Sequence, residues 1–410
     1  MRATVYRRPA MLWRQVRDVL NFYYPDCLDD RFGGYVAQLD ERTGHVYDGE
    51  TKHLVATARA VHNFGVGAAL GGPDWCRPAA ERGLTFLANA HWDADREGYD
   101  WVLEGRETAD DTRYCYGHAF VLLAAARAVE AGIPGARAEL DRAFGVIDER
   151  FWEPDRGLCA DRADGGWETL ATYRGQNANM HTCEAMLAGY EATGEAAFLD
   201  RAYRIADSFV RDVAAQTDGL LWEHYTEDWE PDLSYNRDEP RHQFRPWGYQ
   251  PGHHAEWAKL LLVLDRHRSE DWPAERAREL FDAATDWWDD EFGGFYYTVE
   301  ADGEPVVADK YGWAVAEAIG AAALLSERDD DYLAWYDRLW AYADEHFVNP
   351  KYGNWYERLS RENERDGPNR GTAVEPGYHP LNNAVVAMES FERRGDSGAY
   401  SPYSSYSSGV

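Results

Sequence analysis

Asp30-Arg-Phe-Gly-Gly34-Tyr35 is the first of six short stretches in which a charged residue leads into a glycine flanked by aromatic or aliphatic residues. The other five stretches are centred on Gly98, Gly157, Gly219, Gly294 and Gly353. These glycines recur every roughly 60 to 75 residues, and self-similarity at a fixed period is typical of repeat architectures. Between successive glycines lie two segments with apolar residues at helical spacing. The pattern predicts a ring of paired helices around one central cavity.

Helical periodicity, with an apolar stripe on one side, is clearest in twelve segments. These segments are 10–23, 52–70, 78–91, 110–131, 136–151, 178–193, 196–215, 254–267, 272–288, 310–326, 330–346 and 380–393. We therefore expect an all-α fold, an (α/α)6 barrel of six helical hairpins with short β-hairpins in its loops. The run from Gly294 to Val299, followed by Ala301-Asp-Gly303, predicts one such β-hairpin. An open α-solenoid is the alternative, but it needs atypical capping repeats at its ends.

The even repeat predicts one domain over residues 1–395 rather than several domains. Residues 396–410 are rich in Ser, Tyr and Gly and lack periodicity, so we interpret them as a disordered tail or an appended segment. One connection, 217–253, is much longer than the others and carries several aromatic residues. Long irregular loops inside compact domains are usually functional.

The charge balance is strongly acidic. Among 410 residues, 73 are Asp or Glu and 42 are Lys or Arg, which gives a formal net charge of -31. Such a surface repels phosphate backbones and disfavours nucleic-acid binding. The excess is spread over every segment, which indicates solvation and adaptation to high salt.

Cysteine usage and hydropathy point to a reduced, water-filled compartment. The five cysteines are scattered, with no Cys-x-x-Cys spacing, and are expected to be small buried hydrophobes. The first residues lack the apolar core of a signal peptide, and no apolar run approaches the length of a membrane span. We expect a cytoplasmic protein with no membrane partner.

Three histidines stand where chemistry is expected. His181-x-x-Glu184 and His253-x-x-Glu256 each place a His and a Glu on one helical face after a polar loop. His379 lies at the start of the final predicted helix. Free backbone N–H groups at helix starts favour oxygen-rich ligands. Three histidines from three repeats, at equivalent helix ends, would converge on the mouth of the barrel.

Simpler interpretations compete with this one. A single His-x-x-Glu is more often a surface or half-buried pair than a site, and the adjacent His253 and His254 are not separable by spacing. The histidines that stand alone on their helices are interpreted as structural or surface residues: His62, His91, His118 and His346. A divalent cation is an alternative ligand, but the spacing is not the His-x-x-x-His of a zinc protease. Amides and arginines in the loops suit hydroxyls, so we expect no metal and no cofactor.

Several motifs resemble the N-acylglucosamine 2-epimerase family. They are Asn179-Met-His181-x-x-Glu184, Pro251-Gly-His253-x-x-Glu256-Trp257, Trp313-x-x-x-Glu317 and Tyr378-His379. The likeness runs from about residue 10 to 393, essentially the whole chain. The stretches around Tyr173–His181 and Trp222–Trp229 look closest to the mannose isomerase branch of the family.

The resemblance implies an (α/α)6 barrel and metal-independent proton transfer on a reducing sugar. It implies that His253 and His379 handle the substrate proton. It further implies pocket positions that hold hydroxyls or orient the histidines: His181, Arg59, Tyr116, Asn177, Arg245, Glu256, Trp313 and Glu317. The chain departs from many relatives before the last histidine, where Val374-Glu375-Pro376-Gly377 replaces a stretch that contains Lys.

Histidine suits this reaction because its ordinary pKa of about 6.5 lets it act as acid and as base. Abstraction of the C2 proton of an aldose needs such a base and stabilisation of the enediolate. Reprotonation at C1 then gives a ketose, and reprotonation at C2 from the opposite face gives an epimer. We predict an aldose–ketose isomerase of the mannose–fructose type, with a sugar 2-epimerase as the alternative.

Two other functional classes remain open on the sequence. An (α/α)6 glycoside hydrolase would need two carboxylates about 5 to 10 Å apart, and no pair stands out beside the three histidines. A non-catalytic carbohydrate-binding protein would not need several converging polar groups. The expected partner is a small sugar, and a homodimer is compatible with the sequence.

The acidic surface generates a prediction about salt. Thermal stability should rise with KCl, because the Debye length falls to about 3 Å near 1 M and screening suppresses self-repulsion. Melting curves in a KCl series test this, and greatest stability in dilute buffer would contradict it.

Overall fold

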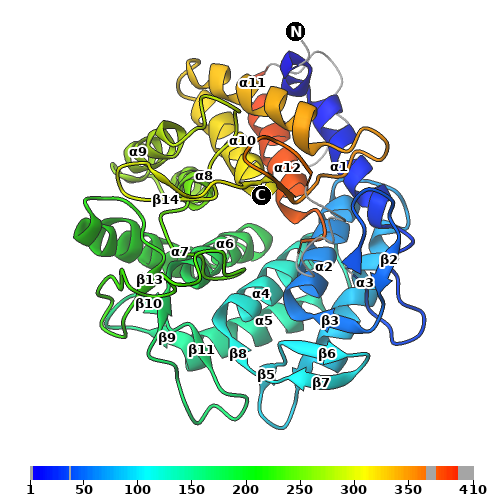
Figure 1. Ribbon diagram of the computed structural model, residues 1–410. Coiled ribbons are helices and arrows are strands. Elements are labelled where there is room, and N and C mark those ends of the chain that lie inside the picture. The colour runs from blue at the N-terminus through cyan, green and yellow to red at the C-terminus, as the bar shows by residue number, and fades with distance from the viewer. Residues whose placement is uncertain (1–2, 37, 366–374, 396–410) are drawn as a thin grey trace.

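The computed structural model describes residues 3–36, 38–365 and 375–395. The helices form a closed double ring, and the chain runs once around it (Figure 1). The described residues contain twelve α-helices, which confirms the (α/α)6 barrel. The predicted tail, 396–410, lies outside the described residues.

Six helices form the inner ring. They are α2 (Leu54–Ala69), α4 (Cys115–Glu130), α6 (Gln176–Thr193), α8 (Pro251–His267), α10 (Gly312–Ser326) and α12 (Tyr378–Arg393). Each contacts the next, and α12 contacts α2, so the ring closes. A helix surrounded by other helices is apolar on all sides. In α10, for example, every residue except Trp313 is buried.

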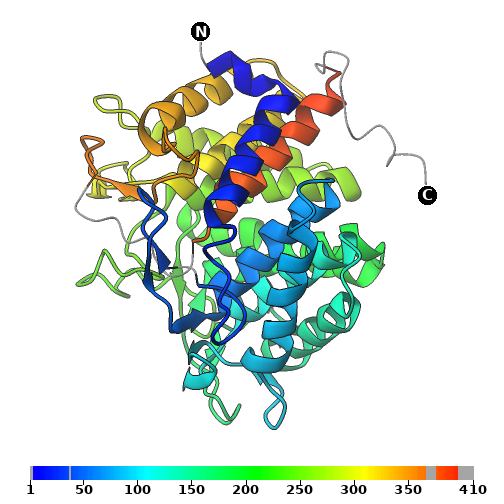
Figure 2. The same cartoon turned by 90° about the vertical axis from the view of Figure 1, so that its right-hand side faces the viewer.

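Six helices form the outer ring, each with one buried face. They are α1 (Pro9–Tyr23), α3 (Cys76–Phe86), α5 (Ala136–Val146), α7 (Ala196–Asp207), α9 (Pro273–Asp286) and α11 (Tyr332–Tyr342). Helices α2 to α11 form five sequential hairpins. The sixth pair joins α1 to α12, which lie side by side although they come from opposite ends of the chain (Figure 2). The expected sixth hairpin is therefore a pairing of the first and last helices.

Several outer helices are extended by short tighter or wider turns. The 3-10 turns are η1 (Ala3–Arg7) and η5 (Ala214–Thr217). The π-helical turns are η2 (Leu87–His91), η3 (Ile147–Phe151), η4 (Ser208–Val213) and η6 (Ala343–Phe347). Such turns account for the predicted helical segments that reached past the ends of α3, α5, α7 and α11.

Short antiparallel ladders occupy the loops. The strands are β1 (Gln38–Leu39), β2 (Val46–Asp48), β3 (Thr51–His53), β4 (Trp92–Asp93), β5 (Gly98–Tyr99), β6 (Val102–Glu104), β7 (Glu107–Asp110), β8 (Arg113–Tyr114), β9 (Trp152–Glu153), β10 (Leu158–Cys159), β11 (Arg162–Ala163), β12 (Arg174–Gly175), β13 (His224–Tyr225), β14 (Thr298–Val299), β15 (Pro305–Val307), β16 (Lys310–Tyr311) and β17 (Arg358–Leu359). The predicted hairpin after Gly294 is confirmed as β14 paired with β15.

Four ladders fix the starts of inner helices. Strands β3, β8, β12 and β16 directly precede α2, α4, α6 and α10, and they pair with β6, β11, β13 and β17 from the following loops. The predicted helices at 52–70, 110–131 and 310–326 therefore begin too early, because the residues before Leu54, Cys115 and Gly312 form ladder hydrogen bonds instead. The ladders hold the N-terminal ends of the inner helices together at one end of the barrel.

Buried ion pairs link those ladders to the glycine turns. Lys52 contacts Asp29, and Lys310 lies 2.8 Å from Asp289 in the equivalent place of another repeat. The same arrangement recurs in two more repeats, where Arg113 pairs with Asp93 and Arg174 pairs with Glu153. A buried charge is tolerated when it is paired and hydrogen-bonded. Each of these pairs therefore ties a turn to the start of the next inner helix.

The glycines of the turns adopt the left-handed region that favours glycine. Gly34 has φ 64°, and Gly157, Gly219, Gly294 and Gly353 lie between 70° and 85°. The second turn is different, because its left-handed residue is Glu97 at φ 56°. Gly98 is needed there for space, since an added Cβ would lie 2.8 Å from Nε of Arg113.

All five cysteines are buried and unpaired, as expected. Among the described helices, each is too short or too polar to cross a bilayer.

We predict that Gly294→Ala destabilises the protein by about 2 kcal/mol. Gly294 has φ 75°, and an added Cβ would lie 2.4 Å from the hydroxyl of Tyr342. Gly145→Ala is the matched control, because Gly145 lies inside α5 with nothing within 4 Å. Alanine there should stabilise the helix by about 0.5–1 kcal/mol. Urea unfolding of both variants measures the difference, and equal effects would contradict the assignment.

Candidate active site

A cavity of about 240 Å³ opens at the end of the barrel where the inner helices begin. Each of the six inner helices contributes a residue from its first two turns. The lining residues are Arg59, Tyr116, Asn177, His181, Arg241, Gln243, Phe244, Pro246, Gln250, His253, Glu256, Tyr297, Tyr311, Trp313, Glu357, Arg358, Glu375 and His379. Helix N-termini add positive potential to such a cavity, and the polar side chains suit a hydroxyl-rich ligand.

His379 is held on both sides of its ring. Its Nδ1 lies 2.7 Å from Oε1 of Glu317, and its Nε2 lies 3.2 Å from Nη2 of Arg59. A guanidinium can only donate hydrogen bonds, so Nε2 is the acceptor and Nδ1 carries the proton that Glu317 accepts. Neutral His379 therefore presents a lone pair on Nε2 next to Arg59, as a proton acceptor requires.

His253 is held in the same way by another carboxylate. Its Nδ1 lies 2.9 and 3.0 Å from the two oxygens of Glu223 and 2.6 Å from Nε2 of Gln176, whose amide also donates to that carboxylate. Trp257 donates to the Gln176 carbonyl oxygen at 2.9 Å, which fixes the orientation of that amide. Burial alone would raise the pKa of Glu223, but the hydrogen bonds and charge of His253 hold it below its usual range. The ionised carboxylate favours a proton on Nδ1 of His253, whereas the amide of Gln176 at the same nitrogen favours a lone pair there.

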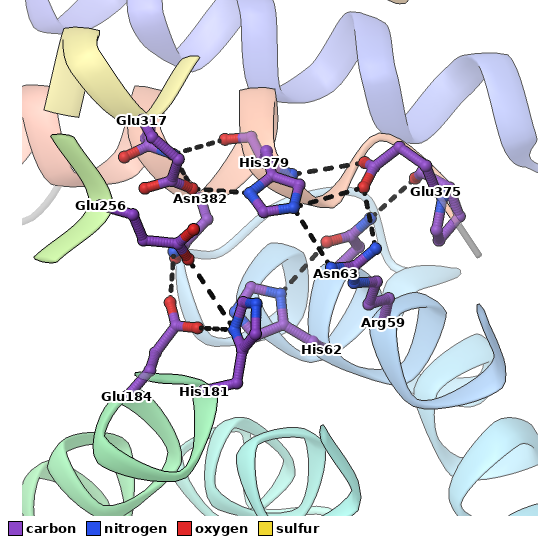
Figure 3. A network of polar contacts seen from close by, with 12 residues as sticks. Arg59, His62, Asn63, His181, Glu184, Glu256, Glu317, Glu375, His379 and Asn382 are labelled. Carbon is purple, nitrogen blue, oxygen red and sulfur yellow. Dashed lines mark hydrogen bonds and ion pairs between the residues drawn. The ribbon is translucent and has the colours of Figure 1, made fainter. Parts of the chain in front are cut away.

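The His-x-x-Glu spacing of His253 and Glu256 does not produce a paired His and Glu. Although the two residues are three apart on α8, the His253 ring turns toward Glu223 in the long 217–253 connection. Glu256 instead points toward His181, with 3.8 Å between its Oε1 and Nδ1 of His181 (Figure 3).

His181 lies deeper, on the second turn of α6. Its Nδ1 lies 3.0 Å from Oε2 of Glu184, so this predicted His-x-x-Glu pair forms. Burial lowers the pKa of His181 to about 4, and Arg59 and His379 act in the same direction. His181 is therefore neutral at neutral pH. Its ring centroid is 6.4 Å from that of His379.

Glu256 is a buried carboxyl group that faces the cavity. It is 0% exposed, and among the described residues neither of its oxygens has a hydrogen-bond partner. Burial, reinforced by Glu317, raises the pKa of Glu256 well above its ordinary value. The raised pKa favours the protonated form of Glu256, in which the carboxyl group can donate to a ligand hydroxyl.

Two overlapping groups of side chains have the spacing of metal ligands. They are His181, Glu184 and Glu256, and Glu256, Glu317 and His379. Each histidine in them already hydrogen-bonds a carboxylate through Nδ1, and Lys259 lies 2.6 Å from Glu317. A lysine in contact with the carboxylates supplies the positive charge that a cation would bring. The expectation of a metal-free site stays a prediction.

The predicted site residues divide between the cavity and its surroundings. Those that line the cavity are His181, His253, His379, Arg59, Tyr116, Asn177, Glu256 and Trp313. Glu317 lies behind His379 and orients it. Arg245 does not line this cavity, because it forms an ion pair with Asp161 in an adjoining cavity of about 150 Å³. Tyr116 and Asn177 line both cavities.

The lone histidines lie away from the cavity. His62, His91 and His118 are buried, and burial lowers the pKa of each to between about 3 and 4. His254 is fully buried and bonds the Gln250 carbonyl through Nδ1 and the Leu221 amide through Nε2. His253 lines the cavity and His254 does not, so the structure separates the adjacent pair.

Three charged residues near the cavity were missed from the sequence. Glu223 follows Trp222 in the long 217–253 connection, where no helical spacing links it to His253. Lys259 lies three residues after Glu256 on the same helical face, which was a usable signal. Glu375, noticed as a departure from relatives, lies 3.0 Å from Arg59 and 3.6 Å from His379.

The closed double ring with a histidine-lined cavity at one end defines an (α/α)6 barrel with a candidate active site among its inner helix starts. The chain belongs to the N-acylglucosamine 2-epimerase family, whose sequence model matches residues 33–382. It is 38% identical over 376 residues to the D-mannose isomerase of Marinomonas mediterranea, covering 91% of this chain and 95% of that protein. It is 42% identical over 314 residues to the D-mannose isomerase of Thermobifida fusca, covering 75% and 77%. A crystal structure of D-mannose isomerase superposes with a TM-score of 0.90 at 36% identity, covering 93% of this chain and 97% of that one.

We predict that Glu223→Gln lowers kcat by about 10- to 100-fold while the fold survives. The amide cannot accept the proton of His253 as a charged carboxylate does, so the tautomer of His253 is no longer fixed. Glu230→Gln is the control, because Glu230 is an exposed residue of the same connection. Steady-state kinetics of both variants test the role, and equal kcat values would contradict it.

Proposed function

We propose that the protein is a metal-independent aldose–ketose isomerase that interconverts mannose and fructose. The observation that carries the proposal is the pairing of His253 and His379 with buried carboxylates at one small cavity. Each carboxylate contacts Nδ1, so Nε2 is the ring nitrogen proposed to meet the substrate; in His379 the substrate would take the place of the contact with Arg59. The similarity to two D-mannose isomerases supports the choice of sugar.

His379 is the proposed base. In the open-chain aldose, Nε2 of His379 takes the C2 proton, and the electron pair of that bond forms the C1–C2 double bond of the enediol. Arg59 donates to the oxygen on which charge develops, and electrostatic stabilisation of this kind is usually the largest catalytic contribution. Glu317 stabilises the imidazolium that forms. Return of the proton from His379 to C1 completes the ketose.

His253 is the proposed second acid–base group. The enediol gains a proton at O1 and must lose one from O2, and a neutral imidazole can do both. His253 also suits ring opening, which needs a proton on the ring oxygen and loss of the anomeric hydroxyl proton. The proton on Glu256 provides a further donor to a hydroxyl.

A sugar 2-epimerase is the second candidate. The ring centroids of His253 and His379 lie 5.1 and 5.7 Å from that of Trp313, so both histidines are near one indole. Two acid–base groups near one sugar suit proton removal from one face of C2 and return to the other. Placement of the second histidine relative to C2 decides between the two outcomes.

We also propose a cellular compartment, a salt range and an assembly for the enzyme. Five unpaired buried cysteines fit a reducing cytoplasm. The net charge of -31 fits life in high salt and a small neutral partner rather than nucleic acid. We propose a homodimer as the assembly to test by light scattering.

The reaction is tested by NMR in deuterated water with mannose, glucose and N-acetylglucosamine supplied separately. We predict fructose from mannose, whereas an epimeric aldose would support the second candidate. His253→Asn and His379→Asn should each lower turnover by about 10²- to 10⁴-fold. His45→Asn, at an exposed position, is the control. Near-normal turnover of either active-site variant would contradict the roles.

A further inference from the structure

Lys259 is a buried lysine behind the cavity. It is one of only four lysines in the chain, lies one turn after Glu256 on α8 and is 1% exposed. Its Nζ lies 2.6 Å from Oε2 of Glu317 and 3.5 Å from Oε1 of Glu184. It does not line the cavity, so it acts on a sugar only through other residues.

The two partners of Lys259 are the carboxylates that hold two of the histidines. Glu317, from α10, accepts from His379, and Glu184, from α6, accepts from His181 (Figure 3). The polar contacts therefore form a continuous series of side chains that runs from His379 to His181 through Lys259. Asn382, from α12, also donates to Glu184 at 3.3 Å.

The charges in this series of side chains sum to one negative charge, which one added proton would neutralise. Burial alone would raise the pKa of Glu317 and Glu184, but Lys259 and the histidines hold both below their usual range. The carboxylates in turn raise the pKa of Lys259 above its ordinary value despite its burial. Two ionised carboxylates and one ammonium leave one negative charge, and the raised pKa of Glu256 favours its neutral form. A single imidazolium formed during the reaction would balance it.

We propose that Lys259 is a positioning residue whose positive charge keeps the His379–Glu317 pair free of an extra proton in the resting enzyme, so that His379 can take the proton of the substrate. Without that charge, Glu317 would hold a proton in common with His379, and the base would be occupied before the sugar binds. The inference rests on the proposed role of His379 as the base.

Other charged groups around His379 would remain in a Lys259 variant. Arg59, from α2, lies 3.2 Å from Nε2, and Glu375 lies 3.6 Å away on the same side. His181 is neutral at neutral pH. Arg59 and Glu375 form an ion pair with each other, so their charges offset. Lys259 is therefore the cation that balances the negative charge of Glu317, at the carboxylate oxygen that does not bond His379.

A third cavity, here called the rear cavity, gives access to Lys259 from the other side. It has a volume of about 400 Å³, and its lining includes Glu184, Lys259 and Asn382 together with Arg127 and Arg266. None of its residues lines the sugar cavity. A small cation could reach the position of the Lys259 ammonium without passing the substrate.

The first test compares Lys259→Met with Lys259→Arg. Loss of the positive charge favours an added proton on the His379–Glu317 pair, so the acid limb of the kcat/KM profile should move to higher pH by about one unit or more in the Met variant. The Arg variant keeps the charge and should restore the limb. A Met variant whose activity falls equally at every pH, with no shift of the limb, would overturn the proposal.

An activity-independent titration separates this inference from the choice of reaction. NMR of ring-labelled histidines, assigned with His379→Asn, should show the pair taking up its proton at higher pH in Lys259→Met. If the wild type makes no fructose, the proposed function fails while this titration still stands as a test of Lys259. An unchanged titration, in an enzyme that does make fructose, overturns the role of Lys259 alone.

Chemical rescue provides a further test in case the Lys259→Met variant folds poorly. In Lys259→Ala, ethylammonium should enter through the rear cavity and restore the position of the acid limb, whereas ethanol of similar size should not. Rescue by both compounds would show that only packing was lost and would overturn the proposal. Absence of rescue in a folded variant with an unshifted limb would overturn it as well.

Discussion

Contact between α12 and α2 closes the inner ring, and the site depends on this closure. Arg59 and His379 are 320 residues apart in the chain, yet their side chains lie 3.2 Å apart once the first and last helices meet. Pairing of α1 with α12 supports the same seam from outside. An open solenoid would hold the same helices but would leave His379 without Arg59. The closed ring is therefore a condition for the acid–base site as well as for the core.

Strand ladders and buried ion pairs fix the positions of the inner helix starts within the closed ring. Four short antiparallel ladders hold the starts of inner helices, and buried pairs such as Lys52 with Asp29 tie them to the glycine turns. Inside the ring the histidines face the cavity while their carboxylates lie behind them. Removing one member of a buried pair leaves an uncompensated charge. Glu317 and Glu184 contact Nδ1 of His379 and His181 without lining the cavity.

Repetition made the fold predictable from the sequence, because glycine spacing and helical periodicity are local properties. The convergence of His181, His253 and His379 followed from their places at helix starts. Partners set by the path of a loop were not predictable. Glu256 is the neighbour of His253 on the helix, yet Glu223 holds that histidine because the 217–253 connection folds back over α8. Arg245, from the same connection, lines the adjoining cavity rather than the one with the three histidines. Helix starts were missed where ladder hydrogen bonds outweigh helical periodicity.

The central claim is that His253 and His379 act on one small carbohydrate. A crystal structure with a bound hexitol, an open-chain mimic of the substrate, tests it most directly. The account predicts C1 and C2 of the hexitol, or their oxygens, within about 3.5 Å of a ring nitrogen of each histidine. A hexitol bound elsewhere, or histidine rings turned toward separate regions, would contradict it.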